Sequence, residues 1–478
     1  MIDTVADPKH RLFPIAIVLV LFVAVQAQPQ AAPPPSAADR AAITAASSAE
    51  RDRELKLLGI IAMQPSATAY DIGKPGNANY EESKANPYPI PDLLTMSDGT
   101  KVTTSVQWQK RRAELKTLFD ENVYGKYPAH IPKVTWTVDS TESTTVQGVP
   151  AVVKHITGRA DNSSYPAITV EIHADVVTPA ASKGKRVPVI IGGGSIRPRP
   201  AFPRPAAGQP VHMLSSPPDA PDSAKLLLEH GWGFVGRNSG EVQADNGAGL
   251  NQGIIGLVNK GQPRSLDDWG VLRAWAWGDA RLLDYLETDP DVDATKVGVM
   301  GHSRGGKAAL VAQVDDPRFA ISFISSSGAG GADLYRRNYG EQMGNLTGVS
   351  EFHWFAGNFL KYAAVGHSAN DMPVDSHEFI ALVAPRPIFI GGGALITDPQ
   401  YAPGDAWQDA QGMFMAAVAA SPVWNLLGAK GLGTTTFPPM GTLIDSGDIA
   451  FRQHQYGHTP APNWPYFIEF ADKEFKRR

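Results

Sequence analysis

The chain has 478 residues, of which 43% are hydrophobic and 19% charged, with a formal net charge of -5 and no cysteine. This composition excludes disordered and fibrous proteins, and the absence of cysteine excludes disulfides and thiol chemistry. The acidic balance, without a long run of lysine or arginine, argues against nucleic acid as a partner. We therefore expect a globular protein that is stabilised by its hydrophobic core.

The first residues have the pattern of an export signal. Lys9 and Arg11 precede an apolar stretch over 13–25, and the small-residue pattern VQA follows at 25–27. The stretch is short for a helix that spans a bilayer, which favours a signal peptide over residues 1–27. Because acidic residues also occur in the first ten positions, an uncleaved membrane anchor is the alternative. The pattern predicts a periplasmic or secreted bacterial protein without a stable membrane span after cleavage.

The rest of the chain is expected to form a tether and one domain. Residues 28–58 are rich in Ala and Pro and predict a tether with a short helix, and residues 59–478 are expected to form a single catalytic domain. Helical spacing first occurs over 108–124. Strand-like runs and helical segments then alternate. The strand-like runs are 149–156, 167–172, 187–191, 233–235, 297–300, 319–324 and 387–390, and the helical segments are 223–230, 272–286 and 306–314.

This alternation predicts an α/β protein. We expect a mostly parallel central sheet with helices on both faces, a three-layer sandwich, in which the first strands are candidates for antiparallel pairing. Two stretches, 197–223 and 240–265, are rich in Pro, Gly and Asn. They are expected as loops over the carboxyl ends of the strands, where open α/β sheets hold their sites.

A nucleophile elbow is predicted at residues 301–305. This segment reads GHSRG, follows the apolar run 297–300 and precedes an alanine-rich helical run. In a GxSxG turn between a strand and a helix, small residues allow a strained backbone to expose the serine hydroxyl. Ser303 is therefore the predicted nucleophile.

The base that such a serine needs is predicted at His458. A hydroxyl is a weak nucleophile and requires a base within hydrogen-bond reach, which a carboxylate holds in the right tautomer. The loop after the apolar run 449–451 carries His454 and His458, and an α/β-hydrolase has its base on such a loop. The alternative is that the two histidines bind a metal. Because no third ligand has a matching spacing, no metal is expected.

Three aspartates are candidates for the acid that orients His458. Asp398, Asp405 and Asp409 all follow the strand-like run 387–390. The chain order Ser, Asp, His is that of the α/β-hydrolases. The pattern alone does not choose among the three aspartates.

The oxyanion site needs two or more donors that face the developing negative charge. The backbone N–H of Arg304 is one candidate, and the glycines at 192–194, after the run 187–191, are candidates for another. These glycines lack the GxGxxG spacing and are followed by prolines, so no dinucleotide or other cofactor is expected. Lys307 lies four residues after Ser303 on the predicted helix, which favours a place beside the nucleophile, with a solvated lysine as the alternative.

Several segments between about Tyr80 and Phe475 together resemble a known family, the glucuronoyl esterases of carbohydrate esterase family 15, in their bacterial branch. These segments are GHSRGGK at 301–307, EFHWF at 351–355, MPVDSHE at 372–378 with APRP at 384–387, and GH at 457–458 followed by NW at 463–464. As a set they are far more specific than GxSxG alone.

The resemblance implies the α/β-hydrolase fold and a role for single residues. It implies Ser303 as nucleophile, His458 as base, Asp405 as acid, Arg304 as an oxyanion donor through its guanidinium, Lys307 and Glu341 as ligands of sugar hydroxyls, and Trp407 as the aromatic that covers the sugar. The chain departs from the family at one position. Many members have a second acid after the strand that follows the elbow, and Ser326 stands at that place here. The role of the acid therefore rests on Asp405.

The function that the resemblance implies is that of a carboxylic ester hydrolase of the 4-O-methyl-glucuronoyl methylesterase type. Its substrate would be glucuronoxylan or a lignin–carbohydrate fragment, cleaved at the ester of 4-O-methyl-glucuronate with no cofactor. One alternative is an acetyl xylan esterase or general carboxylesterase of the same fold, because a triad does not encode the acyl group. A non-catalytic carbohydrate-binding descendant is another. The oligomeric state, the preferred alcohol and the length of xylan bound stay open.

Overall fold

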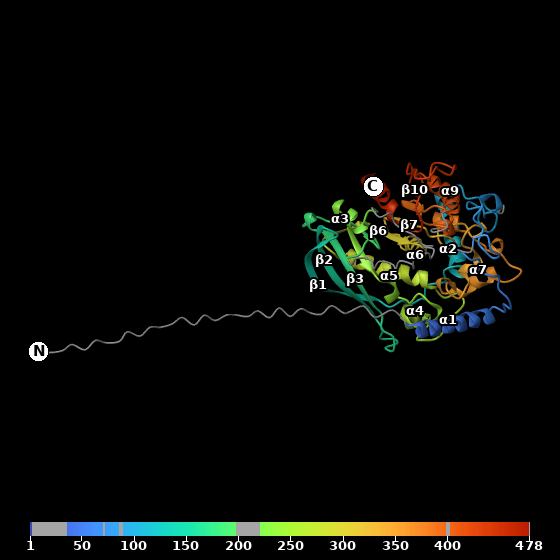
Figure 1. Cartoon of the computed structure of the whole chain (residues 1–478), viewed down its shortest axis with the longest axis horizontal. Coiled ribbons are helices and arrows are strands. Elements are labelled where there is room, and N and C mark those ends of the chain that lie inside the picture. Colours follow the sequence, from blue (N-terminus) through green and yellow to red (C-terminus); the bar gives the residue numbers. More distant parts are fainter. Residues whose placement is uncertain (2–35, 70–71, 86–88, 197–219, 398–401, 478) are drawn as a thin grey trace. The chain divides into compact units, whose positions relative to one another are not determined.

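The computed structural model describes all residues except 2–35, 70–71, 86–88, 197–219, 398–401 and 478 (Figure 1). The signal peptide predicted over 1–27, most of the loop predicted over 197–223, and Asp398 lie outside the described residues. The chain divides into two units, Met1–Arg40 and Ala41–Arg478, and the second contains the whole sheet.

The sheet has ten strands in the order β1-β2-β3-β5-β4-β6-β7-β8-β10-β9. Strands β5, β4, β6, β7, β8 and β10 run parallel to one another, whereas β1, β2 and β3 at one edge and β9 at the other are joined by antiparallel pairing. The strands are β1 (Val134–Val146), β2 (Val149–Ala160), β3 (Glu171–Pro179), β4 (Val187–Ile191), β5 (Gly233–Arg237), β6 (Val292–His302), β7 (Ile321–Ser325), β8 (Ile388–Gly392), β9 (Leu443–Ile444) and β10 (Ile449–Gln453).

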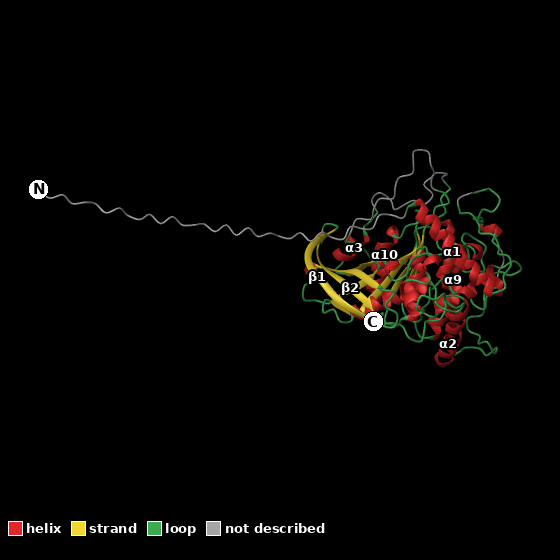
Figure 2. Cartoon of the chain, turned by 90° about the horizontal axis from the view of Figure 1, so that it is seen from below, coloured by secondary structure: helices red, strands yellow, loops and turns green. Residues whose placement is uncertain are grey.

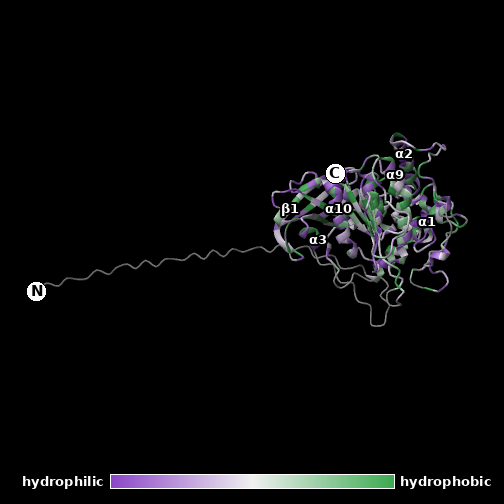
Figure 3. Ribbon diagram, turned by 90° about the horizontal axis from the view of Figure 1, so that it is seen from above, coloured by the Kyte–Doolittle hydropathy of each residue, from purple (hydrophilic) through white to green (hydrophobic). Residues whose placement is uncertain are grey.

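Helices cover both faces of this sheet, as predicted (Figure 2). Along β4, Val189 and Ile191 belong to one core with α5 (Val271–Leu286), α6 (Arg304–Asp315) and α9 (Ala410–Leu426), whereas Ile190 belongs to a second core with α3 (Ser223–Glu229) and α10 (Trp464–Arg477). This alternation follows from the two-residue period of a strand, and it makes β4 continuously hydrophobic because both faces are buried. Hydropathy colouring shows the same hydrophobic strands between the helices (Figure 3).

Two helices precede the first strand, and from β4 onward helices alternate with most of the strands. They are α1 (Ala37–Leu57), α2 (Ser105–Asn122), α3 (Ser223–Glu229), α4 (Gly253–Val258), α5 (Val271–Leu286), α6 (Arg304–Asp315), α7 (Met343–Leu346), α8 (Ser376–Ala381), α9 (Ala410–Leu426) and α10 (Trp464–Arg477). Over the described part of the chain, no helix combines the length and the apolar character that crossing a membrane requires.

The structure corrects the sequence-based elements in three places. Strand β1 was not predicted, although its first five residues, VTWTV, alternate apolar and polar side chains; the rest of the strand is mostly polar and exposed. The strand predicted over 167–172 begins only at Glu171 and continues to Pro179. Helix α1 is 21 residues long rather than a short helix in a tether, and its Glu54 is fully buried in an ion pair with Arg264.

The parallel arrangement places the candidate site. Strands β6, β7, β8 and β10 are consecutive neighbours in the sheet and run in the same direction. Their carboxyl ends therefore share one edge, and the loops that follow them meet there.

Candidate active site

Ser303 lies on a sharp turn between β6 and α6, which confirms the predicted elbow. Its φ of 59° and ψ of -131° are unusual for a residue other than glycine. A Cβ on Gly301 would lie 1.8 Å from the carbonyl oxygen of Gly305, and one on Gly306 would lie 2.9 Å from that of Ser325. Gly301 and Gly306 are therefore required because backbones approach closely at this turn, whereas a Cβ on Gly305, the second glycine of the motif, would have no atom within 4 Å.

Asp405 and His458 form a hydrogen-bonded pair at the edge where the strands end. Nδ1 of His458 lies 2.6 Å from Oδ1 of Asp405, whose side chain is 1% exposed. An ionised carboxylate only accepts hydrogen bonds, so Nδ1 carries the proton and Nε2 keeps its lone pair. This tautomer is the one that can take a proton from a serine hydroxyl.

Two further groups hold Asp405 in place. Its Oδ2 accepts hydrogen bonds from the backbone N–H of Gly393, at the end of β8, and from the hydroxyl of Ser326 at 2.7 Å. Ser326 follows β7 with a φ of 44°. Ser326, at whose position the resemblance implies a second acid, thus contacts Asp405, the predicted acid.

The base lies beside the residue that precedes the nucleophile. The ring centroids of His302 and His458 are 4.2 Å apart. Within the described residues, the hydroxyl of Ser303 makes no hydrogen bond, so the serine–histidine bond is not closed here. Catalytic hydrogen bonds commonly tighten only in the complex with substrate, which makes this geometry compatible with a triad.

The other candidates for acid and base have structural partners instead. Asp409 caps the N-terminus of α9 and forms a buried ion pair with Arg337. His454 is fully buried, with Nε2 2.8 Å from the carbonyl oxygen of Thr459 and Nδ1 accepting from the N–H of Tyr456. Burial lowers the pKa of His454. Across the residues that the structure describes, no group of three His, Asp or Glu side chains is arranged to hold a metal ion.

The predicted oxyanion donors differ in the hydrogen bonds that their backbone N–H groups make. Arg304 is the first residue of α6, where a backbone N–H has no acceptor within its helix and the helix dipole favours negative charge. The glycine loop after β4 was expected to supply a second donor. That prediction is wrong for Gly192 and Gly193, because their N–H groups donate to the carbonyls of Val235 and Ile190.

Lys307, Glu341 and Trp407 form one cluster. The ammonium of Lys307, 2% exposed, donates to Oε2 of Glu341 at 2.6 Å and to the carbonyls of Ser327 at 2.7 Å and Ala329 at 2.5 Å. The indole N–H of Trp407 donates to Oε1 of Glu341 at 3.3 Å. An ammonium has three donors, so those of Lys307 are all used within the protein.

The indole of Trp354 contacts both this cluster, through Lys307, and Arg304, the predicted oxyanion donor. The guanidinium carbon of Arg304 lies 5.6 Å from the Trp354 ring centroid, and Nζ of Lys307 lies 5.7 Å from it. Both distances suit a cation–π contact. Trp354 belongs to the segment EFHWF at 351–355. The resemblance includes this segment but implies no role for its residues.

Glu351, at the start of that segment, was also missed. Burial, with the negative charge of Glu341, raises the pKa of Glu351 to about 8, against the opposing charges of Lys307 and Arg304. Its buried Oε2 has no hydrogen-bond partner within the described structure. Glu351 is therefore a buried carboxyl group whose neutral form is favoured, a property that depends on its neighbours in the fold.

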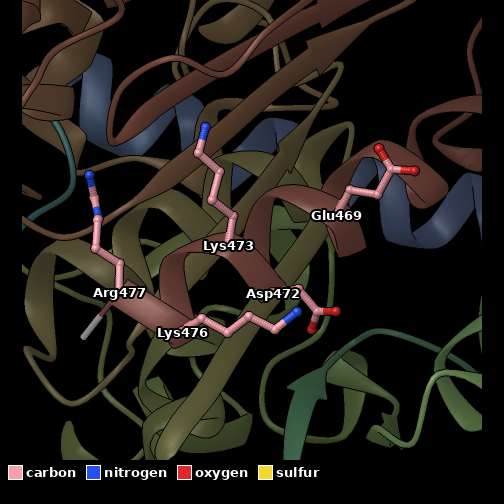
Figure 4. Close-up of a pocket in the computed structure, with 5 residues that line it drawn as sticks. All are labelled: Glu469, Asp472, Lys473, Lys476 and Arg477. Atoms are coloured by element: carbon pink, nitrogen blue, oxygen red, sulfur yellow. The ribbon is translucent and has the colours of Figure 1, made fainter.

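Two hollows of the surface lie away from these residues. One, of about 560 Å³, is lined by charged residues of α10 (Figure 4), and another, of about 410 Å³, is lined mainly by residues near α2 and after α8. Neither is lined by Ser303, Asp405 or His458. The charges of α10 pair with one another and with the preceding loop, as in the contacts of Arg477 with Asp448 and Glu474.

Comparisons with known proteins agree with the geometry of the site. Residues 264–428 match the family model described as "Glucuronyl esterase, fungi". The chain is 32% identical to carbohydrate esterase MZ0003 of an unknown prokaryotic organism, over 84% of this chain and 92% of that protein. It is 28% identical to the 4-O-methyl-glucuronoyl methylesterase of Schizophyllum commune, over 78% of this chain and 81% of that protein.

Solved structures extend the likeness to the fold. A glucuronoyl esterase of carbohydrate esterase family 15 from Teredinibacter turnerae is 37% identical, with a TM-score of 0.78 over 90% of this chain and 100% of that one. The glucuronoyl esterase from Solibacter usitatus is 32% identical, with a TM-score of 0.67 over 82% of this chain and 100% of that one. The sheet, the elbow and these relatives agree, and the chain belongs to the glucuronoyl esterases of carbohydrate esterase family 15.

Proposed function

We propose that this protein is a serine esterase that hydrolyses the ester between 4-O-methyl-glucuronate of glucuronoxylan and an alcohol of the lignin type. The observation that carries the proposal is the pairing of His458 with Asp405 next to His302, the residue that precedes the elbow serine. The printed names of the relatives, which include a 4-O-methyl-glucuronoyl methylesterase, support the choice of acyl group. The compact unit Ala41–Arg478 serves as one catalytic domain.

Acylation begins at the hydroxyl of Ser303. Nε2 of His458 takes the hydroxyl proton while Oγ bonds to the uronate carbonyl carbon, and the carbonyl oxygen becomes an oxyanion. The backbone N–H and the guanidinium of Arg304 stabilise this oxyanion. Asp405 keeps Nδ1 protonated and stabilises the imidazolium. The tetrahedral intermediate then collapses, the alkoxide leaves with the proton from His458, and an acyl-enzyme remains.

Deacylation repeats these steps with water. His458 takes a proton from water, the hydroxide attacks the acyl carbon, and Ser303 leaves with the proton that His458 returns. The products are the free uronic acid and the alcohol. Every proton moves through His458, so no metal or cofactor enters the sequence of steps.

The sugar is assigned to the cluster of Lys307, Glu341 and Trp407. A flat indole suits the face of a pyranose, and charged groups suit its hydroxyls. Because all three donors of Lys307 already bond within the protein, a hydroxyl that binds Lys307 must replace one of those partners. Glu341 can accept from the sugar while it stays paired, so we assign it the direct contact and Lys307 the support of its charge.

The experiment that tests the acyl specificity compares benzyl glucuronate with 4-nitrophenyl acetate as substrates. We expect Trp407→Ala to raise KM for the glucuronate ester about tenfold or more and to leave hydrolysis of the acetate unchanged. Trp407→Phe is the matched control, because it keeps a flat ring and loses only the N–H to Glu341, and it should lie between the two. A clear preference for acetate, unaffected by Trp407→Ala, would instead favour an acetyl xylan esterase or general carboxylesterase.

We also propose that residues 1–27 direct export to the periplasm or the medium. The support is the pattern of basic residues, an apolar stretch and small residues in the sequence. Protein recovered outside the cytoplasm of a bacterial host is expected to begin at Gln28, which N-terminal sequencing measures. A full-length chain that stays with the cytoplasm or the membrane would contradict the assignment.

A further inference from the structure

We propose that Asp245 is a positioning residue for the reaction, which aims the guanidinium of Arg304 at the developing oxyanion. The inference rests on the proposed function, since it concerns the same ester hydrolysis. Asp245 lies in the loop between β5 and α4, about sixty positions before Arg304 in the sequence. No sequence motif points to it.

Both carboxylate oxygens of Asp245 accept hydrogen bonds. Oδ2 accepts from a terminal nitrogen of Arg304 at 2.6 Å. Oδ1 accepts from the indole N–H of Trp354 at 2.7 Å and from Nε2 of His353 at 3.0 Å. One carboxylate thus joins the residue after the nucleophile to the short helix Phe352–Trp354.

The partners of Asp245 are rigid on the side away from Arg304. His353 and Trp354 are 1% and 5% exposed, so their rings are fixed by packing. Burial lowers the pKa of His353, which therefore donates as a neutral ring through Nε2. Because these two donors are fixed, they hold the carboxylate of Asp245 in one position. The carboxylate in turn holds the guanidinium of Arg304.

The loop that carries Asp245 is anchored two residues earlier. The side chain of Gln243 is fully buried, donates to the carbonyl of Gly249 at 2.7 Å and accepts from the N–H of Ile255 at 3.1 Å. The indole of Trp275, on α5, donates to the carbonyl of Gln243 at 2.9 Å. The backbone next to Asp245 is thus tied to a later part of its loop, to α4 and to α5.

Arg304 needs a fixed hydrogen-bond partner such as Asp245 because its side chain is 53% exposed. A long exposed side chain populates several rotamers, and fixing it in advance lowers the entropy that is lost in the transition state. The bond to Asp245 uses one terminal nitrogen of a group with five N–H donors, and the Trp354 ring lies under the guanidinium. The other donors have no acceptor within the described residues and remain for the oxyanion.

The charge of Asp245 is stable over the working range of an esterase. Burial opposes its ionisation, but the hydrogen bonds from His353 and Trp354 and the charge of Arg304 lower the pKa of Asp245 to about 2. The carboxylate therefore stays ionised above about pH 3, and the alignment of Arg304 does not change with pH near neutrality. Asparagine cannot replace it, because its NH2 group would face a donor on one side or the other.

The test is a double-mutant cycle between Asp245 and Arg304. Kinetic constants for benzyl glucuronate are measured for the wild type, Asp245→Asn, Arg304→Ala and the double variant. In the wild-type background, Asp245→Asn is expected to lower kcat on the order of 10- to 100-fold, with KM changed less than about threefold, because the contact acts in the transition state. In the Arg304→Ala background, the same substitution should change kcat by less than about threefold.

Two controls keep the result interpretable. Glu241→Gln removes a carboxylate from the same loop that contacts exposed His173 instead, and it should retain wild-type kcat. If Asp245→Asn does not fold, Asp245→Glu replaces it in the cycle, with a loss of kcat expected only where Arg304 is present. An equal loss in both backgrounds, or no loss in either, overturns the proposal. Failure of the wild type to hydrolyse the ester is a separate outcome that overturns the proposed function.

Discussion

Replacing Ser303 with alanine is expected to lower kcat for benzyl glucuronate by about a million-fold, the loss typical of removing a triad nucleophile. The reason is local. Ser303 is held at the tip of the turn between β6 and α6, and the ring of His458, the predicted base, lies against that of His302, the residue before Ser303. The variant should fold normally, because the hydroxyl makes no hydrogen bond within the described residues.

The measurement is steady-state hydrolysis together with the melting temperature. Ser182→Ala, in the short turn after β3, is the matched control and should retain wild-type kcat. Binding of the uronic acid product to Ser303→Ala should remain measurable, which separates catalysis from sugar recognition. Turnover of Ser303→Ala within tenfold of the wild type would rule out the nucleophile, and would leave the non-catalytic and other-mechanism alternatives.

Replacing Asp405 with asparagine is expected to lower kcat about ten-thousand-fold, with little change in KM. An amide in place of the carboxylate no longer fixes the proton on Nδ1 of His458, so the ring loses the tautomer that accepts from Ser303. Asp405 is 1% exposed and also accepts from Ser326 and Gly393, so the amide disturbs those contacts too.

A second substitution tests whether the loss of kcat comes from the missing carboxylate or from a disturbed structure. In the Asp405→Ala background, Ser326→Glu introduces an acid at the position from which Ser326 now contacts Asp405. We expect this double variant to recover kcat at least tenfold over Asp405→Ala, because the new carboxylate can reach the base from β7. A loss of kcat of less than tenfold in Asp405→Asn would show that another group orients His458. Full activity of that variant with an unchanged melting temperature would show the same.

The sequence predicts the elbow well because its determinants are local. Apolar β6, two glycines and an alanine-rich α6 are contiguous, and close packing at Gly301 and Gly306 leaves no alternative side chain. The base is also predictable, since it follows the last long strand in the chain order of the hydrolases. By contrast, the alternation in β1 covers only its first five residues, VTWTV, and the polar, exposed remainder of the strand gives no signal for its length.

Pairings across the sheet edge are not predictable in this way. Three aspartates followed β8, and only the course of the loop brings Asp405 rather than Asp409 to His458. Gly192 was expected to face the oxyanion, but its N–H completes the ladder between β4 and β5. Asp245 and Glu351 owe their properties to contacts among segments far apart in the chain, which residue types alone do not reveal.

The most direct test of the account is active-site labelling with a fluorophosphonate, followed by peptide mass spectrometry. A phosphonate reacts with a serine that a histidine base activates and forms a stable adduct on its Oγ. We predict one adduct, on the peptide that contains Ser303, formed rapidly in the wild type and far more slowly in Asp405→Asn. An adduct on a different serine, or an active enzyme that is not labelled at Ser303, would contradict the central claim.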